Sequence, residues 1–211
     1  MKIFIVLVFA VLQSLCACSC ATKDAESNGV LQPTEYQEAI HEEYVLCAKD
    51  KTSTVVKLQL PDNGISYTLK QADEEDEVNL TYSEDTGIII SDSSQQELQK
   101  IAIEMYPDDP ADPIQFIDFN QDGYADITVT LGGTLNSQKE VFLWDKTTSQ
   151  FVEVLYDGML SYFEVHGDYI KNWVKDSAKY TVVQTLVWSD PRTLTLESET
   201  ILDVETGEAA T

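Results

Sequence analysis

The chain has 211 residues, and 43% of them are hydrophobic, which is enough apolar material for the core of one ordinary domain. The 13 basic and 37 acidic side chains give a formal net charge of −24 at pH 7. This balance argues against nucleic-acid binding and against docking on an anionic membrane through a basic patch, because both need clustered Lys and Arg. An acidic surface favours solubility, cation binding or a basic protein partner.

The N-terminus has the pattern of an export signal. Lys2 precedes a mostly apolar segment, residues 3–15. This segment is too short to span a bilayer comfortably as a permanent helix, and it has the length of a signal-peptide core. We therefore expect an exported protein with a signal peptide at residues 1–17.

The run LCAC at residues 15–18 resembles the bacterial lipobox. The resemblance implies that Cys18 is the lipidated first residue of the mature protein, which would anchor the chain to the cell membrane. Cys16 is unusual at the middle position of such a motif. Cleavage after Ala21 by the ordinary signal peptidase, which would release a secreted protein, is the alternative.

Residues 18–34 are polar and low in aromatic side chains, so they predict a flexible tether, and residues 35–211 predict a β-rich domain. Thr34 opens a possible capping box for a short helix that ends near Glu43. Cys20 and Cys47 could pair in an oxidising compartment, but a free thiol is an equal alternative, because Cys20 falls in the tether.

Strand patterns dominate the next part of the chain. The segments 55–60 and 65–70 flank the Asn63-Gly64 pair, which favours a tight hairpin turn. The segments 78–82 and 87–90 predict a second pair of strands.

The segment 93–106 predicts one short amphipathic helix. Its apolar side chains recur with helical spacing and form one stripe: Leu98, Ile101, Ala102 and Met105. Ser94 and Glu97 fit a capping box, and Pro107 would end the helix.

Alternating strand patterns continue from residue 114 to the C-terminus, among them 139–145 and 151–156. The predicted fold class is therefore mainly β, an antiparallel β-rich single domain, propeller-like or sandwich-like, with the one helix.

The segment IDFNQDGYADITV, residues 117–129, carries the candidate site. Oxygen-bearing residues alternate around one glycine, and the predicted ligands are Asp118, Asn120, Asp122, the main-chain carbonyl of Tyr124, and Asp126. Calcium prefers six to eight oxygen ligands, and a glycine permits the sharp bend that such a loop needs. An acidic turn without metal is the alternative, but chance rarely places five matching positions in nine between two apolar strands.

The loop differs from an EF-hand at two points. Val129 stands where an EF-hand carries a bidentate Glu, and the flanking segments have strand patterns instead of helical ones. We therefore expect a structural Ca²⁺ site at residues 118–126 in a strand–loop–strand unit, and no calmodulin-type switch.

The segment 117–129 resembles the calcium loop of FG-GAP and VCBS-type β repeats. The wider stretch 110–202 is similar to small bacterial exported lipoproteins, in which a hairpin ending in Asp, a Thr or Ser turn and a Phe follow the loop, and a late hairpin carries a Trp. These positions are occupied here by Asp145, Thr148, Phe151 and Trp188. That family includes immunity lipoproteins that inhibit peptidoglycan hydrolases of the lysozyme type, although no inhibitory loop can be carried over to this sequence.

No catalytic motif is present, so we expect the protein not to be an enzyme. Nothing in the sequence links His41 or His166 to Cys47 as a nucleophile pair. The expected function is an envelope protein that binds or inhibits a basic partner such as a cell-wall hydrolase. The aromatic residues between 156 and 173 support an adhesion or glycan-binding module as the alternative, although core and cross-strand pairing is the commoner explanation of such residues. A calcium-stabilised hydrolase is a third, weaker hypothesis.

Overall fold

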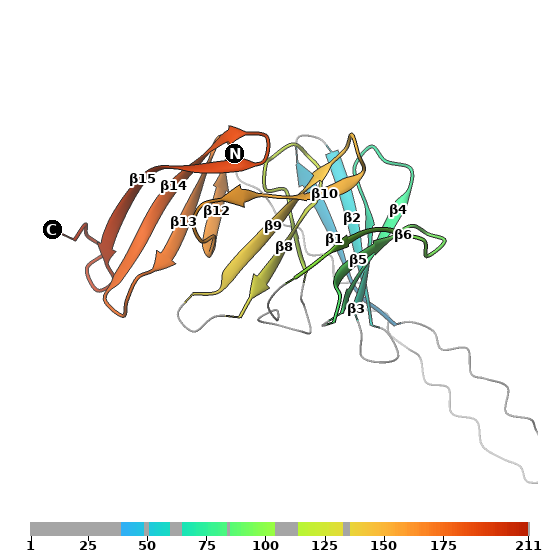
Figure 1. Ribbon diagram of the computed structural model, residues 1–211, viewed down its shortest axis with the longest axis horizontal. Helices are drawn as coiled ribbons and strands as arrows, with labels where there is room; N and C mark the ends of the chain where they lie inside the picture. The colour runs from blue at the N-terminus through green and yellow to red at the C-terminus, as the bar shows by residue number, and fades with distance from the viewer. Residues whose placement is uncertain are drawn as a thin grey trace, which may run out of the picture. The chain divides into compact units, whose positions relative to one another are not determined.

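A computed structural model of the chain describes residues 39–48, 51–59, 65–83, 85–103, 114–132 and 136–210 (Figure 1). These residues form strands and turns, and none of them lies in a helix. The part of the chain that is described therefore also contains no helix that could cross a membrane. The predictions for residues 1–38 fall outside the described residues.

The strands in chain order are β1 (Ala39–Ala48), β2 (Lys51–Gln59), β3 (Ile65–Lys70), β4 (Glu77–Ser83), β5 (Gly87–Ser91), β6 (Glu97–Ile101), β7 (Gln115–Ile117), β8 (Asp126–Leu131), β9 (Gln138–Asp145), β10 (Gln150–Glu153), β11 (Leu155–Tyr156), β12 (Tyr162–His166), β13 (Tyr169–Lys175), β14 (Tyr180–Asp190) and β15 (Thr193–Asp203).

Three sheets are built from consecutive stretches of the chain. The first sheet has the order β1-β2-β3-β4-β5-β6, the second β10-β9-β8-β7, and the third β11-β15-β14-β13-β12. In Figure 1 each sheet accordingly takes neighbouring colours of the bar, from blue and green for the first to orange and red for the third. All pairs are antiparallel except the two-residue pair of β11 with β15. The prediction of a mainly β chain with antiparallel sheets is confirmed.

Side chains of the second sheet enter two cores. Ile127, Val129 and Leu131 of β8 belong to a core that also holds residues of the first sheet. Val141 and Leu143 of β9 belong to a second core, which also holds residues of the third sheet. Because successive side chains of a strand point to opposite faces, the second sheet is buried on both sides.

The predicted helix at 93–106 is wrong over its described part. The carboxylate of Asp92 accepts hydrogen bonds from the backbone N–H groups of Ser94 (2.8 Å) and Gln96 (2.9 Å), and this closes a tight turn after β5. β6 then runs back along β5, with Ile101 opposite Ile88. Pairing with the apolar strand β5 thus overrides the helical propensity of the segment. Leu98, which belongs to the predicted stripe, is 43% exposed.

The short helix predicted from Thr34 to Glu43 is also wrong where the chain is described. Residues from Ala39 onward form β1, which pairs antiparallel with β2. Residues 34–38 lie outside the described residues.

The hairpin at Asp145 has the strand–turn–strand form that the sequence pattern predicts. β9 ends at Asp145, whose carboxylate accepts hydrogen bonds from the Thr147 N–H (2.8 Å) and the Thr148 hydroxyl (3.0 Å). Phe151 of β10 then packs against Trp144, with ring centres 5.0 Å apart. The local sequence signal for this turn is therefore confirmed.

Two amide side chains connect backbones of neighbouring sheets or strands. Gln99 of β6 donates to the carbonyl of Phe151 (2.7 Å) and accepts from its N–H (2.9 Å). Asn136 makes the same two-bond contact with Lys175 of β13, at 2.9 and 2.7 Å. Each amide thus bonds both the backbone N–H and the backbone carbonyl of one strand residue.

Candidate functional site

The segment between β7 and β8 is the strand–loop–strand unit that the sequence predicts. β7 ends at Ile117, β8 begins at Asp126, and these two residues face each other in an antiparallel pair. Four of the five predicted ligands lie in the loop between the strands, and Asp126 is the first residue of β8.

The polar side chains of the loop fold back on the loop backbone. Asp118 accepts a hydrogen bond from the Gly123 N–H (3.1 Å), Asn120 from the Asp122 N–H (3.1 Å), and Asp122 from the Tyr124 N–H (2.9 Å). The Asn120 amide also donates to the Asp122 carboxylate (2.9 Å). Each side chain at these alternating positions thus accepts a hydrogen bond from a backbone N–H of the loop itself.

The turn inside the loop needs a glycine at position 123. Gly123 has a φ of +97°, a conformation that L side chains rarely adopt, and Gln121 has a φ of +57°. This observation explains the single glycine of the motif by backbone geometry, independent of any ion.

Asp126 connects the loop to the rest of the second sheet. Its side chain is fully buried, and its two carboxylate oxygens accept hydrogen bonds from the Phe119 N–H and the Trp144 N–H, both at 2.8 Å. One side chain therefore holds the start of the loop and strand β9 at the same time.

Burial raises the pKa of the Asp126 carboxyl well above its usual range, and the two N–H donors oppose this effect. The nearby carboxylates of Asp122 and Asp118 raise the same pKa further. A cation held by the loop would act in the opposite direction, because it stabilises the charged form of every carboxylate around it.

The donor set of the loop suits a hard cation by its chemistry, since carboxylate, amide and carbonyl oxygens are what calcium prefers. As the side chains stand, no group of three or more His, Cys, Asp or Glu in the described ranges is placed to hold a metal ion. The calcium site stays a prediction.

Two lysines lie against Tyr124, the residue that follows the glycine. The Lys146 ammonium donates to the Tyr124 hydroxyl (2.9 Å), and the Lys51 ammonium lies 3.8 Å from the centre of the ring. The Lys146 hydrogen bond, followed by Lys51, lowers the pKa of the Tyr124 phenol. Lys51 also donates to the carbonyl of Asp122 (3.3 Å), so the first sheet contacts the loop backbone directly.

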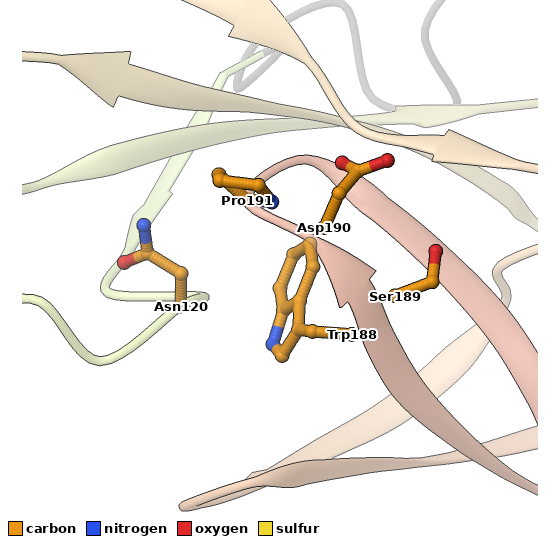
Figure 2. Close-up of a pocket in the computed structure, with 5 residues that line it drawn as sticks. All are labelled: Asn120, Trp188, Ser189, Asp190 and Pro191. Carbon is orange, nitrogen blue, oxygen red and sulfur yellow. The ribbon is translucent and has the colours of Figure 1, made fainter.

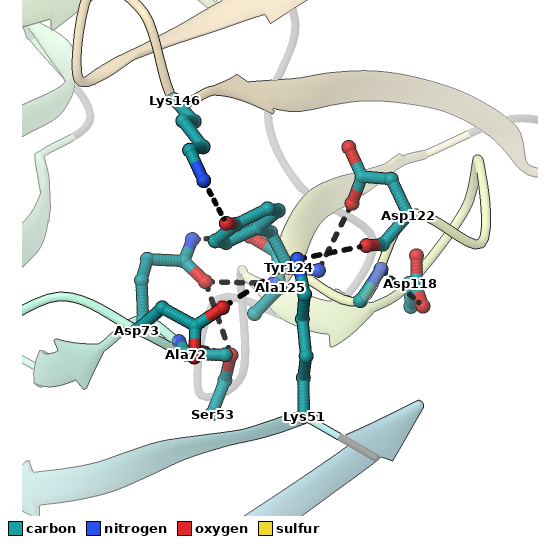
Figure 3. A network of polar contacts seen from close by, with 11 residues as sticks. Lys51, Ser53, Ala72, Asp73, Asp118, Asp122, Tyr124, Ala125 and Lys146 are labelled. Carbon is teal, nitrogen blue, oxygen red and sulfur yellow. Dashed lines mark hydrogen bonds and ion pairs between the residues drawn. The ribbon is translucent and has the colours of Figure 1, made fainter. Parts of the chain in front are cut away.

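A buried polar network connects the other side of the loop to the first sheet (Figure 3). The side-chain oxygen Oε1 of Gln71 accepts hydrogen bonds from the Ala125 N–H (2.7 Å) and the Ser53 hydroxyl (3.1 Å). Its side-chain nitrogen Nε2 donates to the Ala125 main-chain carbonyl (2.7 Å). The Ser53 oxygen in turn accepts from the Ala72 N–H (3.0 Å). Both backbone polar groups of Ala125 are therefore satisfied from the first sheet.

A hollow of about 380 Å³ lies beside the loop. It is lined by Asn120 of the loop and by residues 188–191 at the tip of the β14–β15 hairpin. Figure 2 shows Asn120 on one side of the hollow and Trp188 and Pro191 on the other.

Comparisons with known proteins identify no family for this chain. No protein-family model matches the chain, and no curated protein matches it. A solved structure described as that of a Xanthomonas type IV secretion system related protein matches with a TM-score of 0.37 and 14% sequence identity, over 82% of this chain and 96% of that chain. A likeness at this TM-score supports no inference about function.

The cysteines and histidines considered for lipidation, disulfide pairing or catalysis do not gather at one site among the described residues. Cys18 and Cys20 lie outside the described residues, and His41 and Cys47 lie in β1. His166 stacks on Tyr169 with ring centres 4.9 Å apart, and its Nε2 lies 3.1 Å from the Glu164 carboxylate.

The aromatic residues between 156 and 173 divide into two groups. Phe163 packs edge-on against Phe119 in the second core, at 5.0 Å between ring centres. Tyr162 is paired across strands with Trp173, as expected, yet it is 62% exposed, and Tyr169 is 37% exposed. Core packing thus explains only part of this aromatic cluster.

Three residues that no sequence pattern predicts as neighbours of the loop are Gln71, Lys51 and Lys146. They lie 54, 73 and 22 residues from the loop residues they contact. An isolated glutamine or lysine carries no local pattern that would indicate such a contact. The family resemblance singles out Trp188 in the sequence, but it does not indicate that Trp188 lies beside the loop.

The replacement Asp126→Asn tests the role of the buried carboxylate at constant side-chain volume. An amide offers one acceptor and turns its NH₂ group toward the other backbone N–H, so we expect a loss of about 2–4 kcal/mol in the free energy of unfolding. Urea denaturation measures this loss. The matched change Asp168→Asn, at an exposed turn residue, should cost less than about 0.5 kcal/mol. Equal stability of Asp126→Asn and the parent would refute the role of Asp126 as a double acceptor.

Proposed function

We propose that the chain is an exported lipoprotein of the bacterial cell envelope, anchored through Cys18, whose calcium loop braces a protein-binding module. The module binds or inhibits a basic partner, for which a cell-wall hydrolase of the lysozyme type is the best candidate. We infer that its role is binding and not catalysis. The three consecutive sheets that share two cores are propeller-like in this proposal.

One observation carries the proposal. The oxygen-rich loop is held in place by buried contacts from two sheets, while Asn120 faces an open hollow at the hairpin tip. A loop held in this way is suited to support a binding surface. The formal charge of −24 favours a basic partner, because complementary charge speeds encounter and disfavours acidic competitors.

The exposed aromatic side chains support a second candidate, an adhesion or glycan-binding module. Tyr162 and Tyr169 present ring surface on β12 and β13, and such amphipathic rings are common at binding sites. A glycan array separates the two candidates, since only the second predicts retention of a defined sugar.

Calcium should stabilise the protein against heat. Binding to the native state at 100 times the dissociation constant contributes about 2.7 kcal/mol, which corresponds to a rise in Tm of about 5–10 °C for a chain of this size. Calorimetry with calcium and with EDTA measures the shift. Asp122→Ala should abolish the shift and Asp168→Ala should keep it. An EDTA-insensitive Tm would show that the loop holds no ion.

Binding to a basic lysozyme should weaken steeply with salt. Raising NaCl from about 0.1 M to about 1 M shortens the Debye length from about 10 Å to about 3 Å, so an association steered by opposite charges should lose at least about tenfold in affinity. Titration calorimetry with the lysozyme measures the effect, and an acidic protein of similar size serves as the control. Absence of binding, or binding that ignores salt, would contradict the proposed partner class.

A further inference from the structure

The hollow beside the loop combines an aromatic wall with a carboxylate. Its lining residues are Asn120, Trp188, Ser189, Asp190 and Pro191, and none of these is basic. In Figure 2 the Trp188 indole and the Asp190 carboxylate belong to the same side of the hollow, across from the Asn120 amide. A hollow with this lining suits a group that is both flat and positively charged.

The hairpin side of the hollow is held in position by contacts within the fold. The Trp188 indole packs edge-on against Phe119, at 5.8 Å between ring centres, and Trp188 pairs with Leu194 across the hairpin. The Ser189 hydroxyl donates to the Thr193 carbonyl (3.2 Å). A ligand would therefore meet walls that are already ordered, which lowers the entropic cost of binding.

Asp190 is exposed, and its Oδ1 accepts the backbone N–H of Arg192 (3.0 Å). Hydrogen bonds from the backbone of Arg192 and the side chain of Thr193 lower the pKa of the Asp190 carboxyl, with a weaker contribution from the Arg192 charge. The carboxylate is thus ionised at neutral pH.

We propose that this hollow receives an arginine side chain of the basic protein partner, with the guanidinium stacked on the Trp188 indole and paired with the Asp190 carboxylate. Arginine fits better than lysine, because its planar group both stacks on an aromatic face and donates in a fork to a carboxylate. The net charge of −24 makes a basic partner the complementary one. The inference rests on the proposed function for its partner, and it identifies the contact that this partner makes.

The first test uses the full chain, purified in detergent from the envelope of cells that express it, and a basic lysozyme as the probe, with calcium present throughout. Asp190→Asn keeps the acceptor for the Arg192 N–H and removes only the charge. We expect it to weaken binding about tenfold. The control Glu205→Gln makes the same change of charge beyond the far end of β15, about 30 Å along the hairpin, and should change affinity less than about twofold.

Equal effects of the two replacements would overturn the inference, because they would show that only the overall charge matters. If the parent protein does not bind the lysozyme, the proposed partner fails, and the hollow is tested by a second experiment that needs no partner.

That experiment titrates a short peptide with a central arginine, and the same peptide with citrulline, into the ¹⁵N-labelled chain. The arginine peptide should shift the indole N–H signal of Trp188. The signal of Trp173, which lies in β13 and does not line the hollow, serves as the internal reference. Citrulline is flat and uncharged, so it should shift Trp188 at least about fivefold less at equal concentration. Equal shifts for both peptides, or none for either, would refute an arginine site.

Discussion

The double hydrogen bond of Asp126 is the interaction on which the site depends. A buried carboxylate is costly unless its oxygens are satisfied, and here each oxygen accepts a backbone N–H at 2.8 Å. One donor, Phe119, belongs to the loop and to the second core, and the other, Trp144, belongs to β9 and the first core. The same side chain therefore fixes the loop relative to both cores. Phe119 lies between Asp118 and Asn120, so its hydrogen bond to Asp126 also holds the loop segment that carries these polar side chains.

Amide side chains provide hydrogen bonds to backbone groups where distant segments of the chain meet. Sheets that pack face to face cannot share backbone hydrogen bonds, so a strand end or a loop that meets another sheet leaves polar groups without partners. Gln71 supplies both bonds for Ala125, Gln99 does so for Phe151, and Asn136 for Lys175. Each contact joins residues at least 39 positions apart. These contacts connect segments that are distant in the chain at defined points.

Local sequence patterns predicted most of the strands and the loop. They failed where tertiary contacts determine the secondary structure or the partners of a side chain. β3 was predicted at its observed residues, because alternation and flanking turns are local signals. The prediction of a helix at 93–106 was wrong over its described part, because residues 97–101 pair with β5, and this tertiary contact is not contained in the local spacing. Asp126 was predicted as a ligand from its spacing, but the Trp144 N–H reaches it through the pairing of β8 with β9, which the spacing does not contain. Gln71 and Trp188 approach the loop from distant segments, so the sequence offered no geometric signal for them.

The bracing role that we propose for the loop requires a loop that is rigid before an ion binds. Amide hydrogen exchange in the calcium-free chain tests this rigidity most directly. We expect the N–H groups of Phe119, Ala125 and Trp144 to exchange only through global unfolding, orders of magnitude more slowly than the exposed turn N–H of Thr147. Exchange of all four groups at similar rates would mean that Asp126 and Gln71 do not hold the loop, and would contradict the bracing role.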